Sequence, residues 1–243
     1  MSASDKVHAQ SNPPVITIDG PSGSGKGTIA QRIASKLGFH LLDSGALYRL
    51  LGLQILQQGL SLAKLSEQEL EQHAQRMPAE FHTNTQGDID IVLDNQLVND
   101  QLRTEKAGEM ASQLAAMPAV RRGLLQRQRD FCQPPGLVAD GRDMGTVVFP
   151  GAILKIYLDA SPEARAQRRR KQLIKKGGNV SISILLQDLR RRDLRDRNRK
   201  HAPLMPANDA VIIDSTDLGV ADVVSMVMEL ATKRLSGDIN IDG

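Results

Sequence analysis

The sequence has few aromatic side chains: four phenylalanines, two tyrosines and no tryptophan in 243 residues. A protein that holds nucleic acid mainly by stacking bases needs aromatic platforms, so this composition argues against such a mechanism. The hydrophobic core must instead be aliphatic. A single cysteine, Cys132, excludes an internal disulfide framework and favours a reducing compartment. No catalytic motif surrounds it, which indicates an inert thiol.

Long apolar runs are also missing. No stretch approaches the ~20 apolar residues that a membrane span needs. Residues 1–14 are polar and lack the apolar segment of a secretory signal, so we expect a disordered tail there and a second, frayed tail at residues 236–243. These absences predict a cytoplasmic protein with no membrane partner. The length suits one domain with an insertion, or two small domains.

Positive charge gathers in one segment of the chain. Residues 163–201 hold 14 Lys and Arg against 4 Asp and Glu, whereas the rest of the chain has 17 basic and 24 acidic residues. A protein that coats nucleic acid would spread its positive charge more widely. The segment therefore either faces an anionic ligand or forms a solvated helix face.

Apolar runs separated by helical patterns predict a parallel sheet. We expect strands at residues 15–19, 39–43, 136–141, 152–159 and 209–214, and helices at 26–37, 45–58, 161–176, 182–198 and 219–234. Helical crossovers join strands in the parallel sense. The sequence therefore predicts an α/β fold with five parallel strands and helices on both faces.

Two segments depart from this alternation. Residues 78–103 contain short alternating runs and two turn signals, QGD and DNQ, which predict a small antiparallel insert. A helical pattern then starts near Thr104, is interrupted by Pro118 and continues through VRRGLLQRQRDF. The charged helices at 161–176 and 182–198, broken by Gly177 and Gly178, predict a basic helical hairpin.

The stretch GPSGSGKGT directly follows the first strand. In the pattern GxxxxGK, consecutive backbone N–H groups and the N-terminus of the next helix surround a phosphate, and the lysine reaches the outer phosphates. This loop predicts a polyphosphate site, with ATP as its ligand, formed by Gly20, Pro21, Ser22, Gly23, Ser24, Gly25, Lys26, Gly27 and Thr28.

Gly27 stands where the phosphate-loop pattern has Ser or Thr, and a hydroxyl appears only at Thr28. A Mg²⁺ ion here would therefore be held largely by phosphates and water. An acidic residue at a strand end is expected to anchor those waters. Asp140 is the candidate, and Asp19 is the alternative.

Four motifs in order resemble the bacterial type of the cytidylate kinase family: DGPSGSGKGT (19–28), LLDSGALYR (41–49), ADGRDMGTVVFP (139–150) and DLRDRNR (193–199). The resemblance covers the chain from Val15 to about Leu235. It implies transfer of the terminal phosphoryl group of ATP to CMP or dCMP, with Mg²⁺, in a monomeric enzyme. It also implies one kinase domain over 15–235, with a core (15–60, 136–160 and 203–235), a monophosphate-binding region (61–135) and a lid (161–202).

The resemblance implies which residues bind CMP. Strand ends form the ligand crevice in such sheets, which suits the segment that carries Asp43, Ser44, Tyr48 and Arg49. The edge of cytosine has an amino donor beside two acceptors. By resemblance, Asp143, Arg121 and Ser112 bind the base, and Arg142 binds the phosphate. Asp196 and Arg199 contact the ribose hydroxyls and the substrate.

By the same resemblance, the basic hairpin is a mobile lid that closes over the phosphates. Phosphoryl transfer needs positioning and neutralised charge more than covalent chemistry. The resemblance assigns ATP contacts to Arg169 and Arg192 and a catalytic role to Lys26, Arg142, Arg165, Arg168 and Arg195. No general base is needed because the attacking phosphate oxygen is already anionic.

Two other readings stay open on the sequence alone. Another small-molecule kinase, acting on UMP or AMP, would share the phosphate loop, and rates with each monophosphate would separate it. A nucleotide-gated nucleic-acid-binding protein would use the basic segment, and its affinity for a polynucleotide would depend steeply on salt. The scarcity of aromatics already argues against the second reading, and no nucleic-acid partner is expected.

Overall fold

A computed structural model describes residues 12–83, 89–175, 177–178 and 180–237 of the chain. Five strands form one sheet in the order β2–β6–β1–β7–β8, and every pairing in it is parallel. The strands are β1 (Val15–Asp19), β2 (His40–Asp43), β6 (Leu137–Gly141), β7 (Leu154–Asp159) and β8 (Val211–Asp214). The predicted five-stranded parallel sheet is confirmed, and each strand begins within two residues of its prediction.

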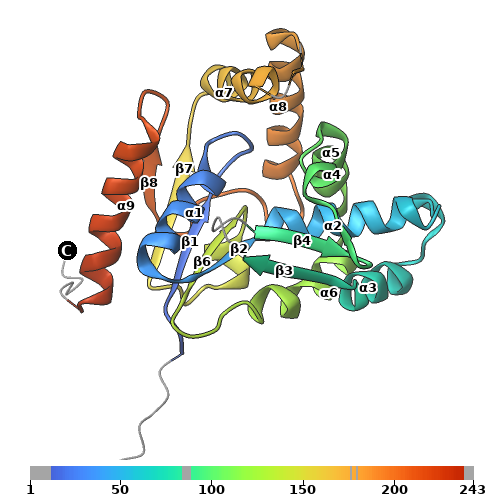
Figure 1. The fold of residues 1–243 in the computed structure, drawn as a ribbon, viewed down its shortest axis with the longest axis horizontal. Helices are drawn as coiled ribbons and strands as arrows, with labels where there is room; N and C mark the ends of the chain where they lie inside the picture. The colour runs from blue at the N-terminus through green and yellow to red at the C-terminus, as the bar shows by residue number, and fades with distance from the viewer. Residues whose placement is uncertain (1–11, 84–88, 176, 179, 238–243) are drawn as a thin grey trace, which may run out of the picture.

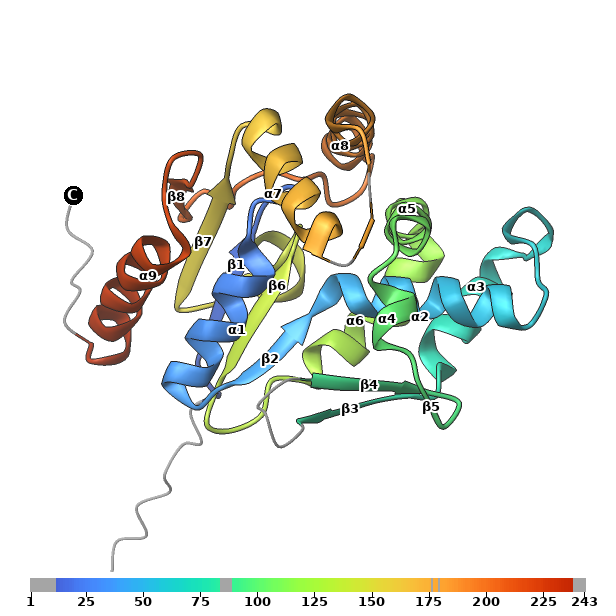
Figure 2. The same ribbon diagram turned by 45° about the horizontal axis from the view of Figure 1, so that its top comes forward.

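Helices cover both faces of this sheet (Figures 1 and 2). On one face, α1 (Lys26–Leu37) and α9 (Val220–Leu235) pack with Ile16 and Ile18 of β1. On the other, α2 (Ser44–Gln57), α5 (Glu105–Leu114) and α6 (Pro118–Arg129) pack with Val15. The alternation along β1 sends its side chains into two separate aliphatic cores, as expected for a central strand covered on both sides.

A three-stranded antiparallel sheet lies beside the main sheet: β3 (Ala79–Thr83), β4 (Ile89–Leu93) and β5 (Gln96–Leu97). The predicted DNQ turn is confirmed, since Asp94 and Asn95 adopt positive φ between β4 and β5. The QGD turn signal lies outside the described residues. The predicted insert ran to residue 103, but its end is the short helix α4 (Asn99–Leu102).

Two elements of this region were not predicted. A 3₁₀ turn, η1 (Leu62–Lys64), precedes α3 (Glu67–Arg76), which packs against α6. A capping box of Ser66 and Glu69 begins α3. The predicted start near Thr104 and the break at Pro118 are confirmed, because Thr104 caps α5 and Pro118 begins α6.

The basic hairpin is present and consists of α7 (Pro162–Lys175) and α8 (Ile182–Arg197). It has a small core of its own, in which Ala166 packs with Leu185 and Leu189. The hairpin lies beyond the carboxyl ends of the strands, next to α5 (Figure 1). In the described part of the chain, no helix is both long and apolar enough to cross a membrane.

Candidate active site

The phosphate loop connects β1 to α1, and its glycines are required by space and backbone conformation. A side chain at Gly20 would place its Cβ 2.1 Å from the carbonyl oxygen of Leu158, and Gly25 has a left-handed φ of 98°. Lys26 opens α1 and is buried. Its Nζ donates a hydrogen bond to the carbonyl oxygen of Pro21 at 3.2 Å, so the lysine folds back over the loop.

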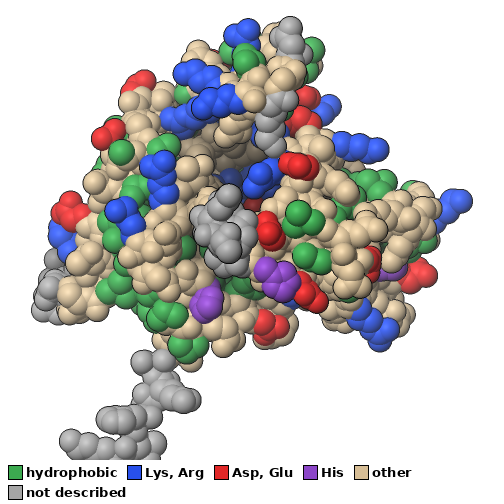
Figure 3. Space-filling model, in the orientation of Figure 1, with side chains coloured by type: hydrophobic (Ala, Val, Ile, Leu, Met, Phe, Trp, Pro, Cys, Tyr) green, Lys and Arg blue, Asp and Glu red, His purple; other side chains and the backbone are tan. Residues whose placement is uncertain are grey.

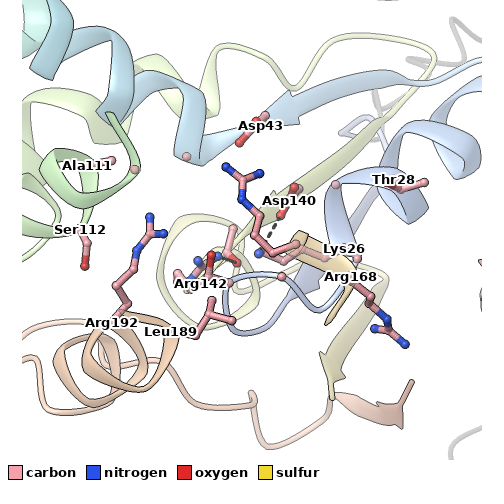
Figure 4. Close-up of a pocket in the computed structure, with 18 of the residues that line it drawn as sticks. Lys26, Thr28, Asp43, Ala111, Ser112, Asp140, Arg142, Arg168, Leu189 and Arg192 are labelled. Carbon is pink, nitrogen blue, oxygen red and sulfur yellow. Dashed lines mark hydrogen bonds and ion pairs between the residues drawn. The ribbon is translucent and has the colours of Figure 1, made fainter. Parts of the chain in front are cut away.

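Asp140 explains why residue 27 is a glycine. This carboxylate belongs to the residue before the last of β6, beside β1, and its Oδ1 lies 3.9 Å from Lys26 Nζ (Figure 4). A Cβ at Gly27 would stand only 3.0 Å from Asp140 Oδ2, a tighter contact than side chains normally make. The carboxylate thus lies close to the space that a Ser or Thr side chain would need. Burial lowers the pKa of Lys26 to about 8 and raises that of Asp140 to about 6.

One cavity of about 670 Å³ runs from the phosphate loop to α5 and α8. Figure 3 shows it as a hollow beneath the basic hairpin, with Lys and Arg side chains around it. Most of the predicted site residues line this cavity: Ser22, Gly23, Gly25, Lys26, Gly27, Thr28, Asp43, Ser44, Tyr48, Arg49, Ser112, Arg121, Asp140, Arg142, Asp143, Arg168, Arg169, Arg192, Asp196 and Arg199.

Five predicted site residues lie outside the cavity wall: Gly20, Pro21, Ser24, Arg165 and Arg195. The first three belong to the phosphate loop, whose other members do line the cavity. Arg165 is 1% exposed and donates hydrogen bonds to the carbonyl oxygens of Ala160 and Ser22, at 2.9 Å each, and to Asp193. It holds the loop and both helices of the hairpin together and does not face the cavity.

The segment at the end of β2 forms one wall of the cavity. Asp43 caps α2 by accepting from the Ala46 N–H, and its other oxygen lies 3.5 Å from Arg49 Nη1. Ser44 is buried and donates to Gln128 of α6 at 2.7 Å. Burial raises the pKa of Tyr48 to about 12, so its hydroxyl stays protonated and can donate a hydrogen bond at neutral pH.

A network of paired charges lies opposite the phosphate loop. Arg121 of α6 pairs with Asp143, whose side chain is 5% exposed. Asp196 of α8 accepts hydrogen bonds from Arg142 Nε at 3.0 Å, from Ser112 Oγ at 3.1 Å and from Arg199. Residues from α5 and α6, from the loop after β6 and from the end of α8 therefore meet here.

The charges of this network fix the ionisation of Asp196. Burial alone would raise the pKa of its carboxyl, but Arg142 and Arg199 outweigh burial and hold the pKa below its ordinary value. Asp196 is therefore a carboxylate at neutral pH. An anionic hydrogen-bond acceptor at this end of the cavity is suited to hydroxyl groups of a ligand.

Acidic residues of α5 hold the arginines of the hairpin. Arg169 donates to Glu105 at 2.5 Å, and Arg192 lies 3.5 Å from the same carboxylate. Arg195 pairs with Glu109 at 2.7 Å. Sequence reasoning did not identify either glutamate, because acids spaced along a polar helix face are common and carry no motif.

Arg168 contacts the far side of the phosphate loop. Its Nη1 donates to the carbonyl oxygen of Ser24 and to Ser215 Oγ, at 3.1 Å each. Ser215 follows β8 and was not predicted as a site residue, although its hydroxyl also reaches Ser24 at 3.2 Å. In Figure 4, Arg168 points away from Ser112 and Arg192, which enter from the side opposite Lys26.

The acidic residues near the loop differ in their fit to a metal. Asp19, the alternative anchor, has both carboxylate oxygens occupied by backbone N–H groups of Met144 and Gly145. Asp140 lines the cavity beside the loop. The described residues contain no cluster of three metal-ligating side chains. This arrangement fits Mg²⁺, which is commonly held by one carboxylate, phosphates and water.

Comparison with known proteins identifies the family of this chain. Residues 16–233 match the family model described as cytidylate kinase. The chain is 52% identical to the cytidylate kinase of Colwellia psychrerythraea over 93% of this chain and all of that protein. It is 53% identical to the cytidylate kinase of Pseudomonas fluorescens over 92% of this chain and 98% of the relative. The chain belongs to the cytidylate kinase family.

Proposed function

We propose that this protein transfers the terminal phosphoryl group of ATP to CMP or dCMP, which gives CDP or dCDP and ADP. One observation carries the proposal: a single cavity contains a phosphate loop at one end and the Asp143–Arg121 pair at the other. The two ends suit a polyphosphate donor and a cytosine base, respectively. The named relatives do not favour a kinase that acts on UMP or AMP.

The phosphate-loop end supplies the donor contacts. Backbone N–H groups of residues 22–28, at the N-terminus of α1, bind the phosphates of ATP, and Lys26 neutralises charge on the transferring oxygens. Asp140 would hold Mg²⁺ through water ligands, and the ion would supply positive charge that offsets the charge of the phosphates. Arg168 lies beside Ser24 and Ser215, where it can contact the nucleoside part of ATP.

The opposite end supplies the acceptor contacts. Asp143 accepts a hydrogen bond from the cytosine amino group, while Arg121 and Ser112 donate to the ring acceptors. Arg49, Arg142 and Arg199 line the same cavity, and we assign the monophosphate to them and the ribose hydroxyls to Asp196. Uracil has an oxygen in place of the amino group, so the Asp143 carboxylate would face another acceptor and reject it.

We divide the chain into regions according to these donor and acceptor contacts. We assign residues 15–60, 136–160 and 203–235 to the core, residues 61–135 to monophosphate binding and residues 161–202 to the lid. Arginines of the lid neutralise the phosphates and exclude water, which would otherwise attack ATP. A cytoplasmic location and a monomeric state stay predictions.

A monophosphate panel tests the function. ADP release is coupled to a spectroscopic signal with ATP and CMP, dCMP, UMP or AMP in turn. We expect kcat/KM for CMP to exceed that for UMP by about 10²-fold or more, since mismatched hydrogen bonds discriminate strongly. Asp143→Ala is expected to reduce this ratio, whereas Asp130→Ala, at an exposed position outside the cavity, keeps it. Equal rates with CMP and UMP in the unmodified enzyme would overturn the proposal.

A further inference from the structure

Asp19 is a buried carboxylate that the proposed chemistry does not use. It ends β1 just before the phosphate loop, and the residue is 5% exposed. Its side chain turns toward a segment more than 120 residues further along the chain. Oδ1 accepts the Met144 N–H at 2.9 Å, and Oδ2 accepts the Gly145 N–H at 2.8 Å.

These two N–H groups begin the π-helical turn η2 (Met144–Val148). The first N–H groups of a helical turn have no partner within it, and the residue at its N-cap normally supplies one. Here the N-cap residue is Asp143, a good capping side chain, yet it makes no cap hydrogen bond. Its carboxylate pairs with Arg121 in the cavity instead.

Asp19 therefore takes over the cap that Asp143 does not provide. A carboxylate also suits the positive end of a helical turn. The backbone of Asp143 is held from the other side, since its carbonyl oxygen accepts the N–H groups of Val147 at 2.9 Å and Val148 at 3.2 Å. The turn that carries the base-reading carboxylate is thus anchored at its first N–H groups by β1.

The packing around the turn leaves little room for it to shift. A Cβ at Gly145 would lie 2.9 Å from Thr17 Oγ1 and 3.1 Å from Lys155 Cδ. The backbone of the turn therefore sits directly on the side chains of β1 and β7. Any loss of the Asp19 hydrogen bonds leaves two buried N–H groups without acceptors, which favours a displaced turn.

We propose that Asp19 is a positioning residue for nucleobase specificity. It caps η2 from another strand and so leaves the side chain of Asp143 free, and correctly aimed, to bind the cytosine amino group. This inference rests on the proposed function, because it assumes that Asp143 binds the base. It gives Asp19 a task distinct from anchoring a metal.

The test compares nucleobase selectivity with donor binding. Asp19→Asn keeps the side-chain volume but places an NH₂ group against one of the two N–H donors. We expect the ratio of kcat/KM for CMP over UMP to fall at least about tenfold, as for a misplaced contact. The KM for ATP is expected to change less than about twofold, because Arg165 and Arg168 hold the phosphate loop independently. Asp19→Ser carries the same expectation should the first variant fail to fold.

Thr17→Val is the matched control. Thr17 is buried on the same strand, and its hydroxyl has no hydrogen-bond partner among the described residues, so its loss should leave the ratio unchanged. In an Asp143→Ala background, Asp19→Asn should lower the ratio no further, because the two residues act in one chain of contacts.

The outcomes separate the two proposals. If the unmodified enzyme does not prefer CMP, the proposed function fails, and the inference about Asp19 fails with it. If the unmodified enzyme prefers CMP but Asp19→Asn lowers kcat/KM for CMP and UMP equally, only the specificity role of Asp19 is overturned. An additive loss in the double variant would also overturn it.

Discussion

Lys26 lies in surroundings that disfavour its own charge. Burial lowers its pKa to about 8, Arg142 acts in the same direction, and Asp140 acts against both. Phosphate groups placed beside the lysine would favour the ammonium form and raise the pKa again. The lysine is therefore expected to gain a proton when a polyphosphate binds in the mildly alkaline range.

We predict that ATP binding near pH 8 is accompanied by proton uptake, because the lowered pKa of Lys26 leaves part of the free enzyme with a neutral lysine at that pH. Calorimetric titrations in buffers with different ionisation enthalpies measure this uptake. Lys26→Arg is the control, since a guanidinium stays charged and should abolish the buffer dependence. The same binding heat in every buffer for the unmodified enzyme would contradict the prediction.

At the scale of single residues, the motifs predicted which residues lie near the site better than they predicted which side chains are buried. The sequence analysis placed Lys26, Asp140 and Asp143 near one another because each lies at or after the end of a strand, and these ends share one edge of the sheet. By resemblance it gave Arg165 the same catalytic role as Arg168 of the same helix, yet Arg165 is buried away from the cavity. A run of arginines shows charge, but which of them is covered depends on how α7 packs.

The buried pair of Arg165 and Asp193 joins the two helices of the lid. Removal of one partner of a buried pair leaves an uncompensated charge, so Arg165→Met is expected to lower the free energy of unfolding by about 3–5 kcal/mol. Urea denaturation followed by circular dichroism measures the loss. Adding Asp193→Leu should recover part of it and part of kcat.

A second pair between the same helices serves as the comparison. Glu163 and Arg190 lie 2.8 Å apart on α7 and α8 but are more than half exposed. Arg190→Met should cost less than about 1 kcal/mol. If the Arg165→Met/Asp193→Leu variant regains stability while its turnover stays abolished, Arg165 has a role at the phosphates and not only in the hairpin.

The elements that the sequence analysis missed have either no clear hydrophobic period or one that is typical of another element. The strands of the main sheet are apolar throughout, so they stand out from their surroundings. In α3 only Leu70 and Ala74 are buried, too few for a clear helical period. The turn η2 was missed for a different reason: its sequence MGTVV is mostly apolar and resembles the end of a strand. Its helical form depends on the cap that Asp19 provides from β1.

Seen as a whole, the molecule supplies counterions for much of its basic segment. Among the described residues of 163–201, seven arginines make ion pairs with carboxylates of α5, α7 or α8: Arg165, Arg169, Arg190, Arg191, Arg192, Arg195 and Arg199. Guanidinium groups held by carboxylates in this way are less available to the phosphates of a polyanion.

We therefore predict weak binding to a single-stranded oligonucleotide, with and without ATP. Fluorescence anisotropy between about 50 and 200 mM salt should show no saturable binding at micromolar protein. A protein that neutralises many phosphates would instead lose about 10³-fold or more in affinity over that range. Tight binding with such a salt dependence would favour the nucleic-acid reading of the basic segment.

The ion pairs between α5 and the lid also bear on how a nucleotide enters. Arg169 and Arg192, which we propose as contacts to ATP, already hold the carboxylate of Glu105. An arriving triphosphate then replaces an anion of the protein itself, and few dissolved ions are exchanged. Folding has already removed much of the water around these guanidinium groups. On this proposal the lid is comparable to a loaded ion-exchange site, and we expect the Glu105 carboxylate on α5 to be released to solvent as the phosphates take its place.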